Sequence, residues 1–373
     1  MKTLLIVAAV FAASFGIIGC SKTETATKQN ESKVSATRTI IDHTGAEVVV
    51  PAEINRVVIG SILPLASVYC MYMGSSEKLV GMHPSSMAAA KNSYLATVFP
   101  EVVKVDSSFV QNGTVNVEEL LKLKPDVVFY AAGNDEECQV YENAGIPAIG
   151  FSTTRKEWHC IDTYADWIDL LSQIFNEESK TARAKEIIDY GYAVEKKIKE
   201  RVANLTDEQK PNVMILFNYD DSAMTAAGHH FFSKYWIETP GGKNVVDAKG
   251  QMKINMEQVY AWNPDIIFIT NFSPRLAEDL LENTVPGTDW SLVKAVQDGK
   301  VYKFPLGMYR WFPPASDTPL VLQWLATKIQ PELFSDIDMD KEIKDYYKRF
   351  YGVDLTPKDL QAIYNPVRAA SGK

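Results

Sequence analysis

Residues 307–312, GMYRWF, place one arginine among three aromatic side chains. A guanidinium flanked by flat rings binds planar or anionic groups, through charge-assisted hydrogen bonds and stacking. We therefore expect Tyr309, Arg310 and Trp311 to contact a ligand of that kind. The alternative is a surface arginine that lies over a packed aromatic corner.

Two adjacent histidines form a second candidate. His229 and His230 precede two phenylalanines. Adjacent side chains on an extended segment point apart, so the pair is not expected to chelate one metal ion. One of them could complete the coordination of a metal in a bound complex, because imidazole is a good ligand for iron, nickel and cobalt. His83 is a weaker candidate of the same kind, and for each histidine the alternative is a bond to the backbone.

Several classes of function are excluded by what the chain lacks. It has no GxxxxGK[ST] phosphate loop, no HExxH or GxSxG motif, and no paired-cysteine zinc signature. The 373 residues include 38 Lys and Arg against 47 Asp and Glu, a formal charge of -9. Nucleic-acid binding needs a strongly basic surface, so no nucleic-acid partner is expected.

Short apolar runs alternate with amphipathic stretches along the chain, a pattern typical of an α/β fold with parallel strands covered on both faces. We expect strands at residues 56–60, 79–82, 126–131, 147–151, 212–217, 265–270 and 301–304. Ligands of such sheets bind beyond the carboxyl ends of the strands. Tyr130 and Tyr219 lie at or near such ends and join the candidate ligand residues.

A concealed repeat links the two halves. Residues 116–130, NVEELLKLKPDVVFY, align without a gap with residues 255–269, NMEQVYAWNPDIIFI, and share five identities. Each copy predicts a short helix, a Pro-Asp stop and a buried strand. Glu118 and Glu257 occupy equivalent, outward-facing positions, whereas residues 120–121 and 259–260 are expected on the buried face. Taken alone, each glutamate could be a solvated first-turn acid that favours the helix dipole.

Between the repeats, apolar residues recur at three- and four-residue steps over residues 179–205, which predicts one long helix. At 1.5 Å per residue this helix would run about 40 Å. We expect it to bridge an amino-terminal α/β lobe at residues 38–178 and a carboxyl-terminal α/β lobe with a helical tail at residues 206–373. The alternative is a helix packed inside a single domain.

The first twenty residues carry an export signal. Lys2 precedes an uncharged apolar run at residues 4–18, which is typical of a secretory signal peptide. Residues 17–20, IIGC, resemble the bacterial lipobox. We expect removal of residues 1–19 and a diacylglyceryl group on Cys20, followed by a flexible tether to residue 37. The alternative is a plain secretory peptide.

In order and spacing, these features resemble the substrate-binding proteins of ABC importers for iron-siderophores, haem, cobalamin and related metal chelates. The resemblance covers nearly the whole chain after the tether. Residues 116–129 and 255–268 are similar to the family's two glutamate helices with their Pro-Asp stops. Residues 241–245, GGKNV, are similar to its Gly-Gly-x-Asn segment, and residues 295–302, AVQDGKVY, to its last strand entry. The tail at residues 331–355 is similar to that of long members.

The resemblance implies two Rossmann-like lobes with a ligand cleft between them and little hinge closure. It also implies that Glu118 and Glu257 dock onto basic residues of a two-subunit permease, which works with a cytoplasmic ATPase. Two equivalent carboxylates suit a two-fold symmetric partner. The chain would be a monomer, lipid-anchored outside the cytoplasm, either in a periplasm or on the outer face of the membrane.

The cargo implied is a metal chelate, first of the iron-siderophore type, with haem, cobalamin and nickel or cobalt chelates as alternatives. No cofactor is expected, because the chelate is cargo. A metal-dependent or chelatase-like lipoprotein enzyme is the alternative of another class. Such an enzyme would need a coupled acid-base constellation, which the sequence does not show.

Overall fold

Two larger sheets, a parallel one in the first half of the chain and a mixed one in the second, organise residues 36–372, the part that the computed structural model describes. The predicted signal peptide, Cys20 and the tether as far as residue 35 lie outside the described residues. An antiparallel hairpin, β1 (Thr37–Ile41) and β2 (Glu47–Pro51), begins the folded part. Residue 37 therefore belongs to a strand and not to the tether.

The amino-terminal sheet has four parallel strands in the order β4-β3-β7-β8. Their bounds are β3 (Val57–Ile59), β4 (Leu79–Met82), β7 (Val127–Ala131) and β8 (Ala148–Phe151). Most of these residues are buried, as expected for strands covered on both faces. A small hairpin of β5 (Val110–Gln111) and β6 (Thr114–Val115) forms a separate sheet.

The carboxyl-terminal sheet has the order β12-β10-β9-β13-β14, with β11 paired to β9. Strands β9, β11, β13 and β14 are parallel, and β10 and β12 are antiparallel to their neighbours. The bounds are β9 (Asn212–Tyr219), β10 (Met224–Ala227), β11 (Lys243–Asn244), β12 (Gln251–Lys253), β13 (Ile266–Ile269) and β14 (Val301–Lys303). The sequence predicts β9, β13 and β14, and misses the three other strands, which are two to four residues long.

Helices fill the connections between these strands. In the first half they are α1 (Leu65–Met73), α2 (Pro84–Asn92), α3 (Leu95–Val98), η1 (Pro100–Lys104), α4 (Val117–Lys122), α5 (Asp135–Asn143), α6 (Cys160–Phe175) and α7 (Glu178–Val202). In the second half they are η2 (Asp207–Gln209), α8 (Phe232–Glu238), α9 (Met256–Trp262), α10 (Ala277–Leu281), η3 (Trp290–Leu292), α11 (Lys294–Gln297), α12 (Thr318–Ile329), α13 (Met339–Tyr351), α14 (Pro357–Tyr364) and η4 (Arg368–Ser371).

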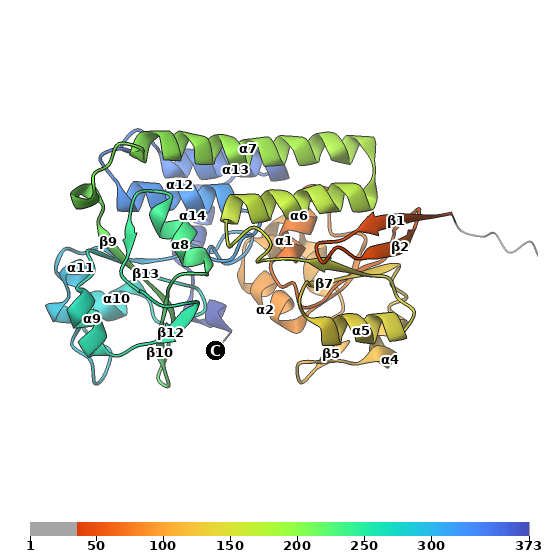
Figure 1. Cartoon of the computed structure of the whole chain (residues 1–373), viewed down its shortest axis with the longest axis horizontal. Helices are drawn as coiled ribbons and strands as arrows, with labels where there is room; N and C mark the ends of the chain where they lie inside the picture. The colour runs from red at the N-terminus through yellow and green to blue at the C-terminus, as the bar shows by residue number, and fades with distance from the viewer. Residues whose placement is uncertain (1–35, 373) are drawn as a thin grey trace, which may run out of the picture. The chain divides into compact units, whose positions relative to one another are not determined.

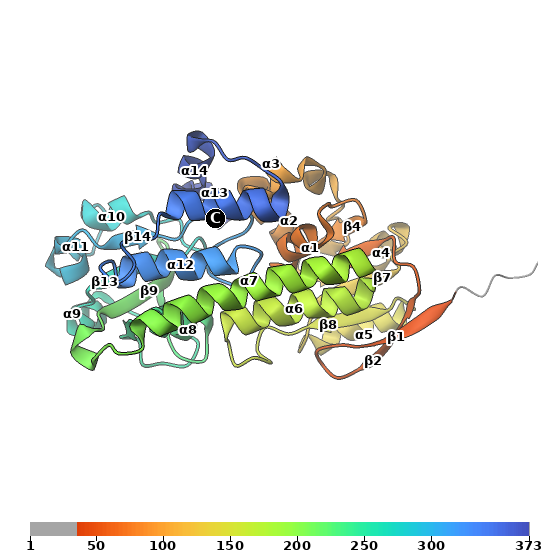
Figure 2. The same cartoon turned by 90° about the horizontal axis from the view of Figure 1, so that it is seen from above.

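Helix α7 bridges the two halves, as the sequence predicts, and ends at Val202 rather than at residue 205. Figure 1 shows α7 along one side of both sheets, and Figure 2 shows it beside α6 and α12, which it contacts. Gly191 allows the close packing of α7 on α6, because a Cβ there would lie 3.2 Å from the ring of Tyr164. The predicted α/β fold of two lobes joined by one long helix is confirmed.

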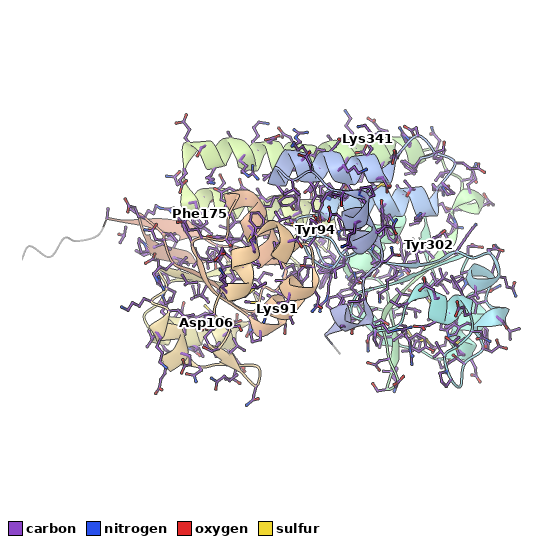
Figure 3. All side chains as sticks on the ribbon, turned by 180° about the vertical axis from the view of Figure 1, so that it is seen from behind. Lys91, Tyr94, Asp106, Phe175, Tyr302 and Lys341 are labelled. Carbon is purple, nitrogen blue, oxygen red and sulfur yellow. The ribbon has the colours of Figure 1, made fainter. Side chains whose placement is uncertain are left out.

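The helical tail packs on both lobes and not only on the carboxyl-terminal one. Tyr346 of α13 lies 3.5 Å from Met71 of α1, and Tyr347 packs edge-on against Tyr94, with ring centroids 5.8 Å apart. Figure 3 shows Tyr94 where the tail meets the amino-terminal half. Arg183 of α7 donates hydrogen bonds to carbonyls of both α1 and α13. These long-range contacts hold the lobes together with α7.

Candidate functional site

The loop that carries Arg310 lies where the two lobes meet. Its first residue, Gly307, accepts a hydrogen bond of 2.8 Å from the backbone N–H of Tyr94 in the amino-terminal lobe. Its last residue, Phe312, accepts a bond of 2.6 Å from the indole N–H of Trp236 in α8. The loop is therefore fixed from both sides before any ligand binds.

Arg310 is only 6% exposed and lies over the ring of Phe272, with the guanidinium carbon 4.9 Å from the ring centroid. Its Nε and Nη2 donate to the carbonyl oxygen of Ala370 at 3.3 and 3.0 Å. Tyr309 lies beside it, at 5.9 Å. A guanidinium stacked on one ring, with its donor edge toward oxygen acceptors, is suited to hold carboxylates, oxyanions or phosphates.

Two of the predicted ligand residues in this loop are core residues instead. Trp311 is 1% exposed and donates its indole N–H to Asp317 at 2.9 Å, and Tyr309 is 3% exposed. Asp317 also accepts the backbone N–H of Met308 at 2.7 Å. Trp311 thus holds the loop in shape below Arg310. The sequence pattern located the loop but not the direction of its aromatic side chains.

The neighbouring loop, residues 270–275, carries Phe272 and is clasped by two polar side chains. The Lys303 ammonium donates to the carbonyls of Thr270, Ser273 and Arg275 at 2.6 to 2.8 Å. Burial lowers the pKa of Lys303 to about 7. The amide of Asn271 donates to two carbonyls of the segment after β14, at 3.0 and 2.8 Å. Both contacts fix the position of Phe272 under Arg310.

A group of partly exposed aromatic rings extends from this point to the other lobe. Phe272 stacks on Phe217 at 4.9 Å, Phe217 contacts Phe231 at 5.5 Å, and Phe231 contacts Trp158 of the amino-terminal lobe at 5.5 Å. None of the four was predicted as a ligand residue. Phe272 lies two residues after the predicted strand at residues 265–270, which was the available signal, whereas the contacts of the other three join residues far apart in the sequence.

The predicted histidines lie at different places around this group. His230 is exposed and adopts a left-handed backbone conformation, with φ 51°, one residue before Phe231. His229 points to Asp247, with Nε2 3.5 Å from the carboxylate. His83 caps α2, since its Nδ1 accepts the N–H of Ser85 at 3.1 Å, and burial lowers its pKa. No contact joins His83 to the two other histidines within the described residues.

Two predicted ligand tyrosines are buried. Tyr219 ends β9, is 4% exposed and packs on Trp290 in the core of the carboxyl-terminal lobe. Tyr130 is a β7 residue with 3% exposure. Strand β9 runs two residues beyond its predicted end. Tyr219 is therefore a strand residue that packs in the core, and it does not lie in the loop after the strand. Neither hydroxyl is presented to a ligand in this structure.

Glu118 and Glu257 lie on α4 and α9, which Figure 1 shows on the side away from α7, one in each half. Both glutamates are exposed, and neither lies in an ion pair within residues 36–372. The repeat also places Leu121 and Tyr260 at equivalent positions, and both are exposed, at 47% and 36%. Their predicted burial was wrong, because each short helix buries only one residue against its sheet.

Two hollows lie elsewhere. One of about 720 Å³ is lined by residues 74–80, 98–106 and Tyr351, and one of about 450 Å³ by residues 205–211 and 329–333 with Asp265 and Lys300. Neither includes a predicted ligand residue. Among residues 36–372, no three His, Cys, Asp or Glu side chains are grouped as metal ligands, and no helix has the length and apolar character to span a membrane.

Comparison with known proteins decides the family. Residues 71–306 match the family model described as periplasmic binding protein. The chain belongs to this family. A periplasmic solute binding protein from Veillonella parvula has a similar structure, with a TM-score of 0.79, 33% identity and coverage of 88% of this chain and 97% of that one.

Two relatives of this binding protein have named ligands. The molybdate-binding protein MolA of Haemophilus influenzae is 25% identical over 343 residues, covering 86% of this chain and 93% of MolA. The heme uptake protein IsdE of Staphylococcus aureus is 26% identical over 191 residues, covering 50% of this chain and 62% of IsdE. The family predicted from the sequence is confirmed, and these relatives are named for binding and for uptake.

Proposed function

We propose that this periplasmic binding protein is an extracytoplasmic lipoprotein of an ABC importer, and that it captures an anionic metal chelate between its lobes. Arg310 is the observation that carries the proposal. It is a buried cation at the lobe junction, stacked on Phe272, and its hydrogen-bond acceptors are neutral carbonyls. A buried charge of this kind is stabilised by an ionic partner. An iron-siderophore is the first candidate cargo, and haem, cobalamin and nickel or cobalt chelates are alternatives.

Fluorescence titration tests the cargo. Trp158 is a partly exposed reporter that contacts Phe231. The panel contains ferric siderophores, haem, cobalamin, nickel-histidine and molybdate, each at matched concentration. One compound should give saturable quenching, and Arg310→Ala should weaken its binding by at least tenfold. Arg349→Ala, which removes an arginine paired with Glu186 on the far helices, is the matched control. Chemical turnover of the bound compound would support the chelatase-like alternative instead.

Docking to the permease forms the second part of the proposal. Glu118 and Glu257 would meet basic residues of two permease subunits, and Leu121 and Tyr260, one helical turn further, would add apolar contact at both places. The equivalent exposure of both pairs supports a partner with two similar halves. Glu119 differs, because it is paired with Lys122 at 2.7 Å.

The docking test measures transport and cargo affinity in the same variants. Glu118→Ala with Glu257→Ala should abolish uptake and leave the cargo Kd unchanged, whereas Glu119→Ala, on the same helix, should leave both unchanged. Loss of cargo affinity in the double variant would contradict the assignment.

Lipid attachment is tested separately. Cys20→Ser in the full precursor should move the protein from the membrane fraction to the soluble extracytoplasmic fraction. A variant that stays in the membrane fraction would contradict the lipobox interpretation.

A further inference from the structure

The segment after α14 crosses from one lobe to the other at the Arg310 loop. We call residues 367–372 the strap. Within it, η4 contacts α2 of the amino-terminal lobe, and Ala370 is only 3% exposed. Figure 1 shows this end of the described chain between the two halves, on the side away from α7. The strap therefore lies where the proposed cargo would reach Arg310.

The strap makes the hydrogen bonds that a ligand would make. The carbonyl of Ala370 accepts from Nε and Nη2 of Arg310, and the carbonyl of Ser371 lies 3.5 Å from Nη2. Carbonyl oxygens satisfy the N–H donors, and no acidic side chain among residues 36–372 forms an ion pair with Arg310. A ligand with anionic oxygens would satisfy both the donors and the charge, so it would bind this edge more strongly than the strap does.

A separate contact anchors the strap. Arg368 donates to both carboxylate oxygens of Asp279, in α10, and to the carbonyl of Pro274 at 3.1 Å. The Asp279 side chain is 12% exposed and that of Arg368 is 50% exposed. This ion pair involves neither Arg310 nor Phe272, and the loop that carries Phe272 keeps its three hydrogen bonds from Lys303 when Arg368 is removed.

The local charge favours the same class of ligand. Lys303, which clasps the loop under Arg310, donates to three backbone carbonyls, and neither it nor Arg310 is paired with an acidic side chain among residues 36–372. Arg368 lies close enough to lower the pKa of the Lys303 ammonium further. The one acidic group that raises this pKa is Asp279, which is already paired with Arg368. A ligand with anionic oxygen atoms would supply the charge that the buried cations Arg310 and Lys303 lack among their described partners.

We infer that the strap is a built-in occupant of the Arg310 ligand position, and that a cargo with anionic oxygen atoms displaces it on binding. This inference rests on the proposed function, because it assumes that cargo reaches Arg310. The cargo and the strap then compete for Arg310. The apparent Kd of the cargo equals its intrinsic Kd divided by the fraction of molecules in which the strap has left. A weaker strap gives tighter apparent binding.

Release of the anchor tests the competition in the full chain. Arg368→Ala should tighten the apparent Kd of whichever probe binds, among molybdate, haem and nickel-histidine, by about three- to tenfold, as expected for loss of a partly buried ion pair. Arg349→Ala removes an ion pair of similar exposure away from the strap and should leave the Kd unchanged.

The variant Ser371→Cys reports directly whether the strap is in place, because Ser371 is 9% exposed. Its reaction with a maleimide should be slow in the unliganded chain, faster in Arg310→Met, and at least fivefold faster when a probe saturates the protein. The wild-type chain supplies the background, which must be subtracted because Cys138 is partly exposed, whereas Cys70 and Cys160 are buried and burial raises their pKa.

The outcomes separate the two proposals. Binding of a probe with unchanged cysteine reactivity and no effect of Arg368→Ala would overturn the strap and leave the importer function intact. Absence of binding by every probe and by the ferric siderophores of the titration panel, in Arg368→Ala as well, would overturn the anionic cargo and therefore both. Faster reaction on binding together with a tighter Kd in Arg368→Ala would support both.

Discussion

Replacement of Asp317 by asparagine tests what holds the Arg310 loop in place. Asp317 is 1% exposed, and one of its oxygens accepts from Met308 N–H at 2.7 Å, Trp311 Nε1 at 2.9 Å and the Tyr347 hydroxyl at 3.2 Å. It has no ion-pair partner within residues 36–372. Asp317→Asn keeps an oxygen acceptor for these donors and removes the charge.

The magnitude follows from the titration of this carboxyl. Burial raises the pKa of Asp317 from 3.8 to about 6, against the opposing effect of its hydrogen bonds. This rise corresponds to about 3 kcal/mol, at about 1.4 kcal/mol per pKa unit. The native state binds the proton more tightly than the unfolded state. Asp317 therefore contributes stability that is fully present below about pH 4 and is lost as the pH rises through about 6.

Urea unfolding followed by tryptophan fluorescence measures the effect. Other groups titrate alike in both proteins, so the free energy of unfolding of Asp317→Asn minus that of the wild type should grow by about 3 kcal/mol from pH 4 to pH 7. Asp345→Asn, an exposed change on α13, should show no such trend. Parallel pH profiles for wild type and Asp317→Asn would refute the idea of a destabilised buried carboxylate.

Two further changes probe the same loop. In Gly307→Ala, a Cβ would lie 1.9 Å from an Asp317 oxygen. The substitution should therefore lower the free energy of unfolding by several kcal/mol, as overpacking does, and reduce cargo affinity. An unchanged melting temperature would contradict this. Lys303→Met should remove a rise in stability between pH 7 and pH 10, since the lowered pKa of about 7 means that the unfolded state binds more protons in that range. Urea unfolding at both pH values decides the second case.

The regular elements could be predicted because each is specified by adjacent residues. The strand at residues 79–82 has the predicted bounds, and α7 differs from prediction by one residue at its start and three at its end. The gapless repeat predicted equivalent positions on the two lobes, which neither copy predicts by itself. The exposed glutamates recur on both lobes, and so does the burial of Leu120 and Val259. Local pattern and burial agree for these two residues and disagree for Leu121 and Tyr260, which were expected on the buried face and are exposed.

The ligand region could be predicted only in part, because its contacts join distant residues. The pattern singled out Arg310, whose ligand role stays a prediction, but its hydrogen-bond acceptors lie 60 and 61 residues further along the chain. The strap sequence, VRAASG, has no periodicity that predicts a contact. Tyr219 and Trp311 were assigned to a ligand because they are aromatic and near a strand end or an arginine. Whether such a ring faces a ligand or a core depends on which helix packs behind it.

The proposed cargo capture and the proposed docking need opposite charges, and the fold places those charges apart. Glu118 and Glu257 are exposed on the outer helices, whereas Arg310 is 6% exposed at the lobe junction. Salt screens exposed charges strongly, since the screening length falls from about 10 Å at 0.1 M to about 3 Å at 1 M, and it affects buried pairs much less. Sodium chloride at 1 M should therefore weaken binding to the reconstituted permease by about tenfold and change the cargo Kd by less than about twofold. Glu118→Gln with Glu257→Gln should abolish the salt effect on docking. An equal loss of cargo affinity would mean that solvent reaches Arg310 in the bound state, and that the two charges are not separated.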